Sequence, residues 1–124
     1  MVPGLMETSE IGEAIPTHVC RLDRYIEDHG LRKISLIKID CEGYEFPVLR
    51  GLSGFFEHTG QLPPIICEIA PAAYPLMGEQ LSDLARHMAK FHYRAFSVTD
   101  CKTPMVLTEL DGTTDVIFIS APDR

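Results

Sequence analysis

Short apolar runs alternate with polar turns along this chain of 124 residues. Four runs of strand length are rich in β-branched or aromatic residues, and they predict strands over 34–40, 64–69, 93–99 and 114–120. Two longer segments carry apolar residues at helical spacing and predict helices over 45–58 and 78–91. The order β-α-β-α-β-β predicts an α/β fold.

The direction of each strand follows from the length of the connection before it. Parallel strands need a crossover, which the two predicted helices supply. The segment between 99 and 114 is too short for a crossover helix, so we expect the last strand to run antiparallel. The strand over 34–40 has apolar residues on both of its faces (Ile34, Leu36, Ile37, Ile39), which predicts helices on both faces of the sheet.

The amino-terminal region shows weaker patterns. Residues 1–16 contain two Pro and two Gly and predict a loose lead-in to one domain over 17–124. A short strand is expected over 17–22. Asp23 is a plausible N-cap for a helical turn or two through His29, which Gly30 would end.

Net charge, apolar content and cysteine spacing limit the classes of partner and the location that we expect for this chain. A net charge of −7 argues against generic attraction to nucleic acid, which needs clustered Lys and Arg. No apolar run approaches the roughly 18 residues that span a bilayer, and the first residues do not resemble a secretion signal. The four Cys lie far apart without a C-x-x-C pair, and we interpret them as reduced thiols of a cytoplasmic protein.

Acidic residues end two successive predicted strands. Asp40 follows the strand over 34–40, and Glu68 lies near the end of the strand over 64–69. The carboxyl ends of parallel strands share one edge of a sheet, so both carboxylates should face one crevice. Lys38 lies two residues before Asp40, on the same face, with the Cα atoms about 6–7 Å apart. We expect Lys38 to pair with these carboxylates, since a lysine in an apolar strand needs a charged partner or water.

The turn after the first of these strands adds four candidates. Glu42 is either a catalytic carboxylate or an exposed turn residue, and Gly43 allows a tight turn. Tyr44 is a candidate contact for substrate. Glu45 opens the next helix, where the helix dipole favours a negative charge, and this role is favoured over catalysis. Asp40, Glu42 and Glu68 are also oxygen ligands of the kind that magnesium or calcium uses, but no dedicated ligand loop accompanies them, so we expect no metal site.

The same residues carry a family resemblance. Leu36-Ile-Lys-Ile-Asp-Cys-Glu-Gly-Tyr-Glu45, followed by Val48-Leu-Arg-Gly51, resembles the signature of FkbM-type S-adenosylmethionine-dependent methyltransferases. Arg21-Leu-Asp23 resembles the family's "T-L-D" element, and Ile65-Ile-Cys-Glu-Ile69 resembles its next strand. The resemblance covers about residues 17–120.

The resemblance implies a function and a cofactor. It implies transfer of a methyl group from S-adenosylmethionine to a hydroxyl of a small molecule or sugar. Asp40 would orient or deprotonate that hydroxyl, with Glu42 and Glu68 as further catalytic candidates. Lys38, Gly43, Tyr44 and Glu45 would lie near the substrate. The reaction would depend mainly on positioning the two reactants.

One part of the family pattern is missing. Such enzymes begin with a strand and a glycine-rich turn of the kind "D-x-G-A-N-x-G", and an acid ending the next strand holds the ribose; this sequence shows neither. The resemblance therefore implies a partial Rossmann-like methyltransferase sheet, with strands in the order 4-5-7-6 of the parent fold. We expect this chain to bind the cofactor poorly by itself.

The missing half has a physical consequence. The strand over 34–40 would lose its neighbour on one side and become an edge strand, which invites pairing with another chain. We expect self-association or a partner chain through this strand, unless 17–22 covers it. A non-enzymatic split module that acts by such pairing is the main alternative to an enzyme. A receiver-like domain that binds magnesium is disfavoured, because it would need five parallel strands and a lysine on a late loop.

Overall fold

The computed structural model describes residues 14–121. Four strands form one sheet in the order β1-β2-β4-β3: β1 (Ile37–Ile39), β2 (Ile65–Ile69), β3 (Tyr93–Ser97) and β4 (Thr114–Ser120). β1 and β2 are parallel, and β4 is antiparallel to both β2 and β3. The predicted fold class, strand order and antiparallel last strand are confirmed.

Five α-helices and one 3-10 helix connect the strands. They are α1 (Leu22–Asp28), α2 (Glu45–Arg50), α3 (Ser53–Thr59), α4 (Ala73–Leu76), α5 (Leu81–Ala89) and η2 (Leu107–Glu109). The predicted strand over 34–40 is shorter than expected, and the predicted helix over 78–91 begins later, after the short α4. β4 has the predicted bounds. The prediction of a loose lead-in over residues 1–16 falls mostly outside the described residues.

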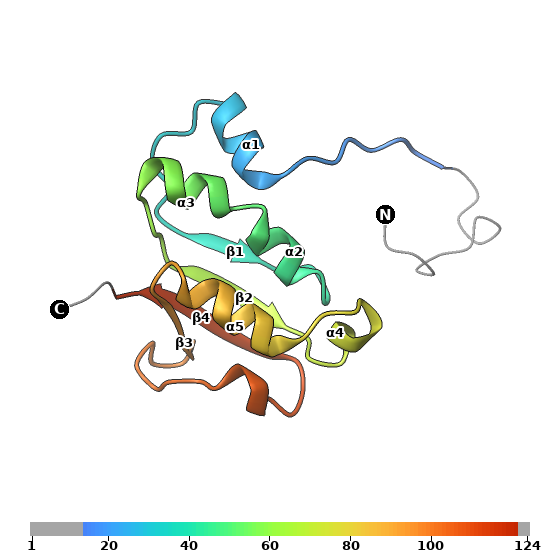
Figure 1. Ribbon diagram of the computed structural model, residues 1–124, viewed down its shortest axis with the longest axis vertical. Coiled ribbons are helices and arrows are strands. Elements are labelled where there is room, and N and C mark those ends of the chain that lie inside the picture. Colours follow the sequence, from blue (N-terminus) through green and yellow to red (C-terminus); the bar gives the residue numbers. More distant parts are fainter. Residues whose placement is uncertain (1–13, 122–124) are drawn as a thin grey trace.

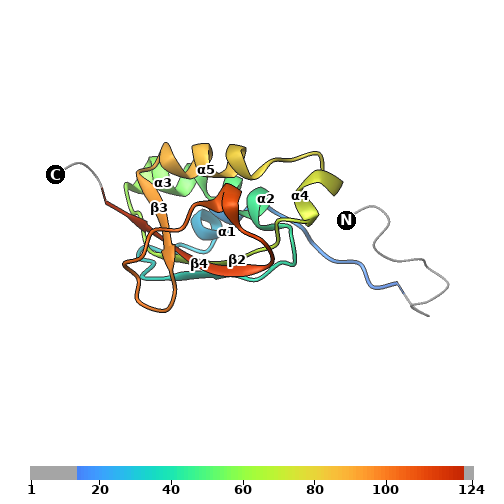
Figure 2. The same cartoon turned by 90° about the horizontal axis from the view of Figure 1, so that it is seen from below.

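The helices gather on one face of the sheet, as Figure 2 shows. The expectation of helices on both faces is therefore wrong for the described residues. The reason is topological: both crossovers, β1 to β2 and β2 to β3, proceed in the same direction across the sheet. Right-handed crossovers that proceed in one direction place their helices on the same side, and only a reversal of strand order covers the other face.

The burial of side chains along the strands agrees with helices on only one face of the sheet. Paired residues share a face, and the helix-covered face holds fully buried side chains, among them Ile65, Cys67 and Val116. On the open face, Lys38, Ile66, Ile117 and Phe96 form one row across the four strands. Lys38 is exposed there, so β1 is not the doubly covered strand that its apolar content predicted.

The region before β1 differs from the prediction. Residues 17–21 form no strand, and α1 begins at Leu22 with Arg21 as its N-cap. Asp23 is therefore not an N-cap but lies in the first turn. The helix does end before Gly30, which has a positive φ of 61°. α1 packs against α3 beyond the free edge of β1 (Figure 1).

The predicted helix over 45–58 is broken in two. α2 ends at Arg50 and α3 begins at Ser53. The carbonyl of Gly51 accepts a hydrogen bond from the backbone N–H of Asp23 at 2.7 Å, and the Asp23 carboxylate accepts one from the N–H of Gly54 at 3.1 Å. Asp23 therefore forms hydrogen bonds with two backbone groups at the break between α2 and α3. Helical periodicity could not predict these bonds, because Asp23 lies far from the break in the sequence.

Candidate functional site

The carboxyl ends of β1 and β2 lie side by side. Ile39 is the register partner of Cys67, and Asp40 and Glu68 are the next residues of the two chains. The structure therefore brings Asp40 and Glu68 to the same edge of the sheet, as the sequence predicted. Asp40 is exposed and Glu68 is half-buried, so both carboxylates are open to a solute.

A third acid joins this edge from β4. Asp115 is the antiparallel register partner of Glu68. Two like charges directly opposite each other destabilise a sheet by a fraction of a kcal/mol up to about 1 kcal/mol. The sequence analysis missed Asp115. Its position could have been found only from the register of β4, because the start of an antiparallel strand meets the ends of its parallel neighbours.

Lys38 does not pair with these acids. Among residues 14–121, the structure shows no ion pair between Lys38 and a carboxylate, and the expected pairing is not found. Lys38 is solvent-exposed, because the face on which it lies carries no helix. Water therefore solvates its ammonium group, which removes the need for a charged partner.

A tight turn links β1 to α2. The N–H of Tyr44 donates to the carbonyl of Cys41 at 3.1 Å, and both central residues have positive φ, 47° at Glu42 and 101° at Gly43. Positive φ at both positions is typical of a type I′ turn. Glu42 and Tyr44 are exposed, whereas Gly43 is buried. A Cβ on Gly43 would lie 2.4 Å from the Cβ of Ala73, so the turn presses directly against the segment after β2.

Glu45 connects the same two segments from inside the protein. Its side chain is fully buried, and Oε1 accepts a hydrogen bond from the backbone N–H of Ala70 at 3.0 Å. Oε2 is buried without a hydrogen-bond partner, as is the hydroxyl of Tyr74. Burial raises the pKa of Glu45, and burial together with the Glu45 charge raises the pKa of Tyr74. Glu45 is the first residue of α2, as the sequence predicted, and its buried carboxyl also links α2 to the segment after β2.

The thiols near this edge are poor nucleophiles. Burial, reinforced by the charge of Glu45, raises the pKa of both Cys41 and Cys67. A thiol with a raised pKa is not a thiolate at neutral pH. All four cysteines are free, with no disulfide between them. The site chemistry therefore lies with the carboxylates.

The described residues do not form a metal site or a cofactor cradle. Within residues 14–121, no three His, Cys, Asp or Glu side chains converge as metal ligands, so Asp40, Glu42 and Glu68 do not form one. Gly43 lies in the turn between β1 and α2, and Ala73 occupies the position that a Cβ on Gly43 would take. This turn is therefore not the open glycine-rich loop that the resemblance implies for the methionine part of S-adenosylmethionine.

The fold and the site together define a class of protein. An open α/β sheet of Rossmann-like construction carries its acids where the parallel strands end. The chain belongs to the FkbM methyltransferase family: the family model described as "Methyltransferase FkbM domain" matches residues 3–95. The match includes every element from α1 to α5 and ends within β3. No curated protein and no solved structure matches the chain.

Proposed function

We propose that this chain is the acceptor side of an FkbM-type methyltransferase that methylates a hydroxyl of a small molecule or sugar. The observation that carries the proposal is the register of β1 and β2, which sets Asp40 beside Glu68 at the carboxyl edge. Asp40 accepts a hydrogen bond from the acceptor hydroxyl and holds it for reaction, a contribution of typically 10²–10⁴-fold for a positioned base. Glu42, Glu68 and Tyr44 line the same edge.

S-adenosylmethionine is the proposed methyl donor, because the chain belongs to a methyltransferase family. Its binding residues lie outside the described part of the chain, in line with the packed turn at Gly43. The proposed location is the cytoplasm, where free thiols such as the exposed Cys20, Cys41 and Cys101 stay reduced. Among residues 14–121, no helix is long and apolar enough to cross a membrane.

Calorimetry with S-adenosylmethionine tests whether the acceptor side and the cofactor-binding residues lie in different parts of the protein. The 124-residue chain should show no binding, whereas the product of the complete reading frame, with any segment encoded upstream, should bind. In that longer product, Asp40→Asn should keep cofactor affinity but lose methyl transfer by about 100-fold or more. Asp28→Asn, an exposed acid on α1, is the matched control and should change neither. Micromolar binding by the 124-residue chain would contradict the proposed division.

A second function has its own support. β1 pairs with β2 on one side, and no other strand within residues 14–121 pairs with it. An unpaired edge favours a non-enzymatic module that acts by adding a partner's strand. If the complete gene product neither binds S-adenosylmethionine nor transfers methyl groups, this module is the better description.

A further inference from the structure

The segment that follows β2 is held in place by a single buried side chain. Residues 70–79 carry α4 and lie past the carboxyl end of β2, at the edge that holds Asp40 and Glu68 (Figure 1). Within this segment only Tyr74 is buried, with 2% of its surface exposed, whereas Leu76 is 88% exposed. A segment that buries so little of its surface opens more easily than the core of a protein.

Two polar atoms without a partner lie beneath this segment. The Tyr74 hydroxyl and Glu45 Oε2 are both enclosed, and neither forms a hydrogen bond within residues 14–121. Glu45 Oε1 accepts a hydrogen bond from the N–H of Ala70 at 3.0 Å, and a Cβ on Gly43 would lie 2.4 Å from that of Ala73. These two contacts place Glu45 and Tyr74 between the same pair of segments. Burial, and then the charge of Glu45, raises the pKa of Tyr74, which agrees with a short distance between them.

The unpartnered atoms destabilise the closed position of the segment. A buried polar atom that has given up its hydrogen bonds to water and gained none in the protein costs free energy. Opening of residues 70–79 would return the Tyr74 hydroxyl and the Glu45 carboxyl to water and remove that cost. Because the described residues already enclose both atoms, another part of the domain reaches neither of them while the segment stays closed.

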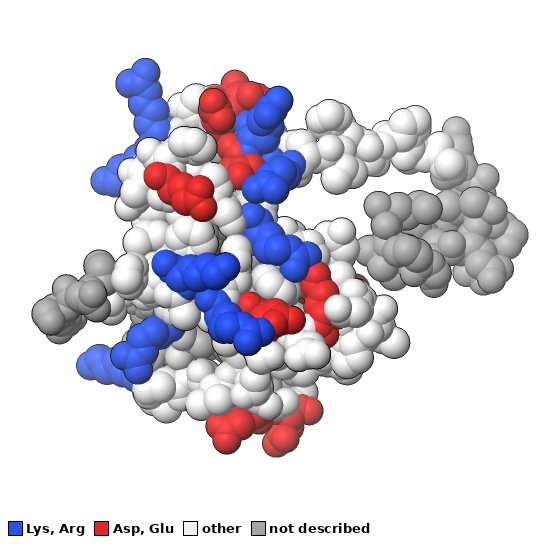
Figure 3. All heavy atoms as spheres, viewed as in Figure 1, with Lys and Arg blue, Asp and Glu red and all other residues white. Residues whose placement is uncertain are grey.

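The outer side of the segment has weak restraints and room to move. Glu79 pairs with Arg50 of α2 at 2.5 Å, but the Arg50 side chain is 44% exposed, and water weakens such a pair. Figure 3 shows basic and acidic side chains lying next to each other in this way over the helices. A groove with a volume of about 290 Å³, lined by Tyr74, Leu81 and Thr108, separates the segment from α5 and η2. The segment is therefore not tightly packed on that side.

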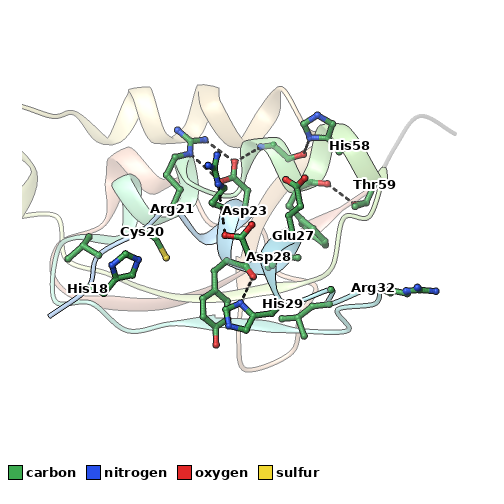
Figure 4. Close-up of a pocket in the computed structure, with 18 residues that line it drawn as sticks. His18, Cys20, Arg21, Asp23, Glu27, Asp28, His29, Arg32, His58 and Thr59 are labelled. Atoms are coloured by element: carbon green, nitrogen blue, oxygen red, sulfur yellow. Dashed lines mark hydrogen bonds and ion pairs between the residues drawn. The ribbon is translucent and has the colours of Figure 1, made fainter.

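The larger groove of the molecule offers no such reason to open. It runs along α1 and α3 and has a volume of about 1180 Å³ (Figure 4). Asp23, His58 and Thr59 line it, and each of these side chains forms a hydrogen bond with a backbone group. It also lies on the side of β1 where the family resemblance places a further strand, so its exposure does not describe the whole domain.

We propose that residues 70–79 form a gate that opens locally and admits small solutes to the interior between α2 and the end of β2. Opening is favoured because it hydrates the Tyr74 hydroxyl and the Glu45 carboxyl. The gate lies beside Asp40 and Glu68, so the solute that it admits is the methyl acceptor; only this last step rests on the proposed function. The opening itself holds whether or not the chain takes part in methyl transfer.

Amide hydrogen exchange on the 124-residue chain measures the opening. The reporters are the amides of Ala70, Met77 and Glu79, whose hydrogen bonds hold the segment closed. Tyr74→Phe keeps the ring and removes the unpartnered hydroxyl, so exchange at these amides should slow by about tenfold. Faster or unchanged exchange in this variant overturns the proposal, because it would mean that the hydroxyl does not favour the open form.

Tyr93 provides the matched control for this substitution. It is also buried, but its hydroxyl donates a hydrogen bond to the carbonyl of Pro63 at 2.6 Å. Tyr93→Phe should lower the denaturant midpoint of the whole protein, whereas Tyr74→Phe should not. Equally slowed exchange at the Ala70 amide in both variants would show that the partner of the hydroxyl does not matter, and the proposal would fail.

The ion pair on the outer side tests the gate from the opposite direction. Arg50→Gln removes the pair with Glu79 and should speed exchange at the Glu79 amide by about threefold, with the amides of β4 unchanged. Arg86→Gln removes the exposed pair with Asp83 on α5 and should change neither set of amides. If Arg50→Gln speeds the β4 amides by the same factor, residues 70–79 open only with the whole protein and do not form a gate.

Thiol labelling tests whether the open form admits a small molecule. Cys67 is fully buried, and its charge also raises the pKa of Tyr74, after burial and Glu45, so it lies close to the gate. Iodoacetamide should alkylate Cys67 through the open form, and Tyr74→Phe should slow this reaction by about the same factor as the exchange at Ala70. The exposed Cys41 is the internal control, and its rate should stay the same. Labelling of Cys67 only as fast as the β4 amides exchange would contradict local admission.

Discussion

Gly43 shows how a single residue fixes the distance between the two segments of the site. It is buried, its φ is 101°, and a Cβ would meet Ala73 at 2.4 Å. A non-glycine residue at positive φ costs about 1–2 kcal/mol, and overpacking of a core adds about 1–3 kcal/mol. Both costs apply at position 43, because the backbone is held at positive φ and Ala73 fills the space that a Cβ would occupy.

Gly43→Ala should therefore lower the free energy of unfolding by about 2–4 kcal/mol, measured by urea denaturation. Gly60→Ala is the matched control. Gly60 also has positive φ, 69°, but nothing lies within 4 Å of its would-be Cβ. Its substitution should cost only the conformational part, about 1 kcal/mol. Equal losses in the two variants would mean that the contact with Ala73 relaxes at no cost.

Glu45 is a second residue that by itself should change the stability of the protein, in this case with pH. Its pKa is raised, mainly by burial, so folding disfavours the carboxylate form of Glu45 relative to the unfolded chain. A raised folded pKa gives a contribution to stability that is present below the unfolded pKa and lost as pH rises through the folded pKa. Besides burial, the charge of Glu68 raises this pKa, whereas hydrogen bonds from backbone N–H groups, including that of Ala70, lower it.

Glu45→Gln should keep the hydrogen bond from Ala70 and remove the titration. Its stability relative to wild type should therefore increase as pH rises above the unfolded pKa of about 4.3, measured by denaturant midpoints at each pH. Glu42→Gln, at an exposed position of the adjacent turn, is the matched control. A stability difference that is constant with pH would show that Glu45 titrates as it does in the unfolded chain.

At the scale of elements, Asp23 decides where helices end. It binds the carbonyl of Gly51 through its own N–H and the N–H of Gly54 through its carboxylate. Its ion pair with Arg21, at 3.0 Å, is the main cause that lowers its pKa. One side chain thus anchors α1 to the break between α2 and α3.

Asp23→Ala should lower the free energy of unfolding by about 1–2 kcal/mol, the usual cost of losing a helix cap. Asp23→Asn should recover part of this, because an amide oxygen still accepts the Gly54 N–H. Since the folded pKa of Asp23 is lowered, the loss in the alanine variant should shrink as pH falls below about 4. Chemical denaturation at pH 7 and pH 3 measures it, and equal losses at both would exclude a role for the charge.

At the scale of the whole molecule, stability should be highest in the middle of the sheet. β2 and β4 each pair on both sides, and their core-facing residues Ile65, Cys67, Val116 and Phe118 are buried. β1 pairs on one side, and α1 packs outside the sheet on α3 (Figure 1). Such peripheral segments open with lower free energies than the core.

Amide hydrogen exchange checks this ranking. The slowest amides should belong to β2 and β4, whereas those of α1 and of Lys38 should exchange faster by several orders of magnitude. Protection in α1 equal to that in β4 would contradict the ranking. It would show that the amino-terminal region opens only when the whole protein unfolds.

The sequence by itself determined the elements that local patterns specify and the family to which the chain belongs. It predicted the four strands, the antiparallel direction of β4 and the placement of Asp40 and Glu68 at one edge of the sheet, because periodicity, connection length and strand polarity are properties of the chain alone. The motif around Asp40 also pointed to the family that the comparison shows.

Only the tertiary structure decided what depends on residues distant in the chain. The break between α2 and α3 at Gly51 depends on hydrogen bonds with Asp23, and the buried position of Glu45 depends on its hydrogen bond from Ala70. The position of Asp115 beside Glu68 depends on the register of β4. One face of the sheet lacks helices among the described residues, because both crossovers proceed in the same direction. Helical spacing and apolar content describe each segment separately, and the free energy of such contacts arises only when the segments pack.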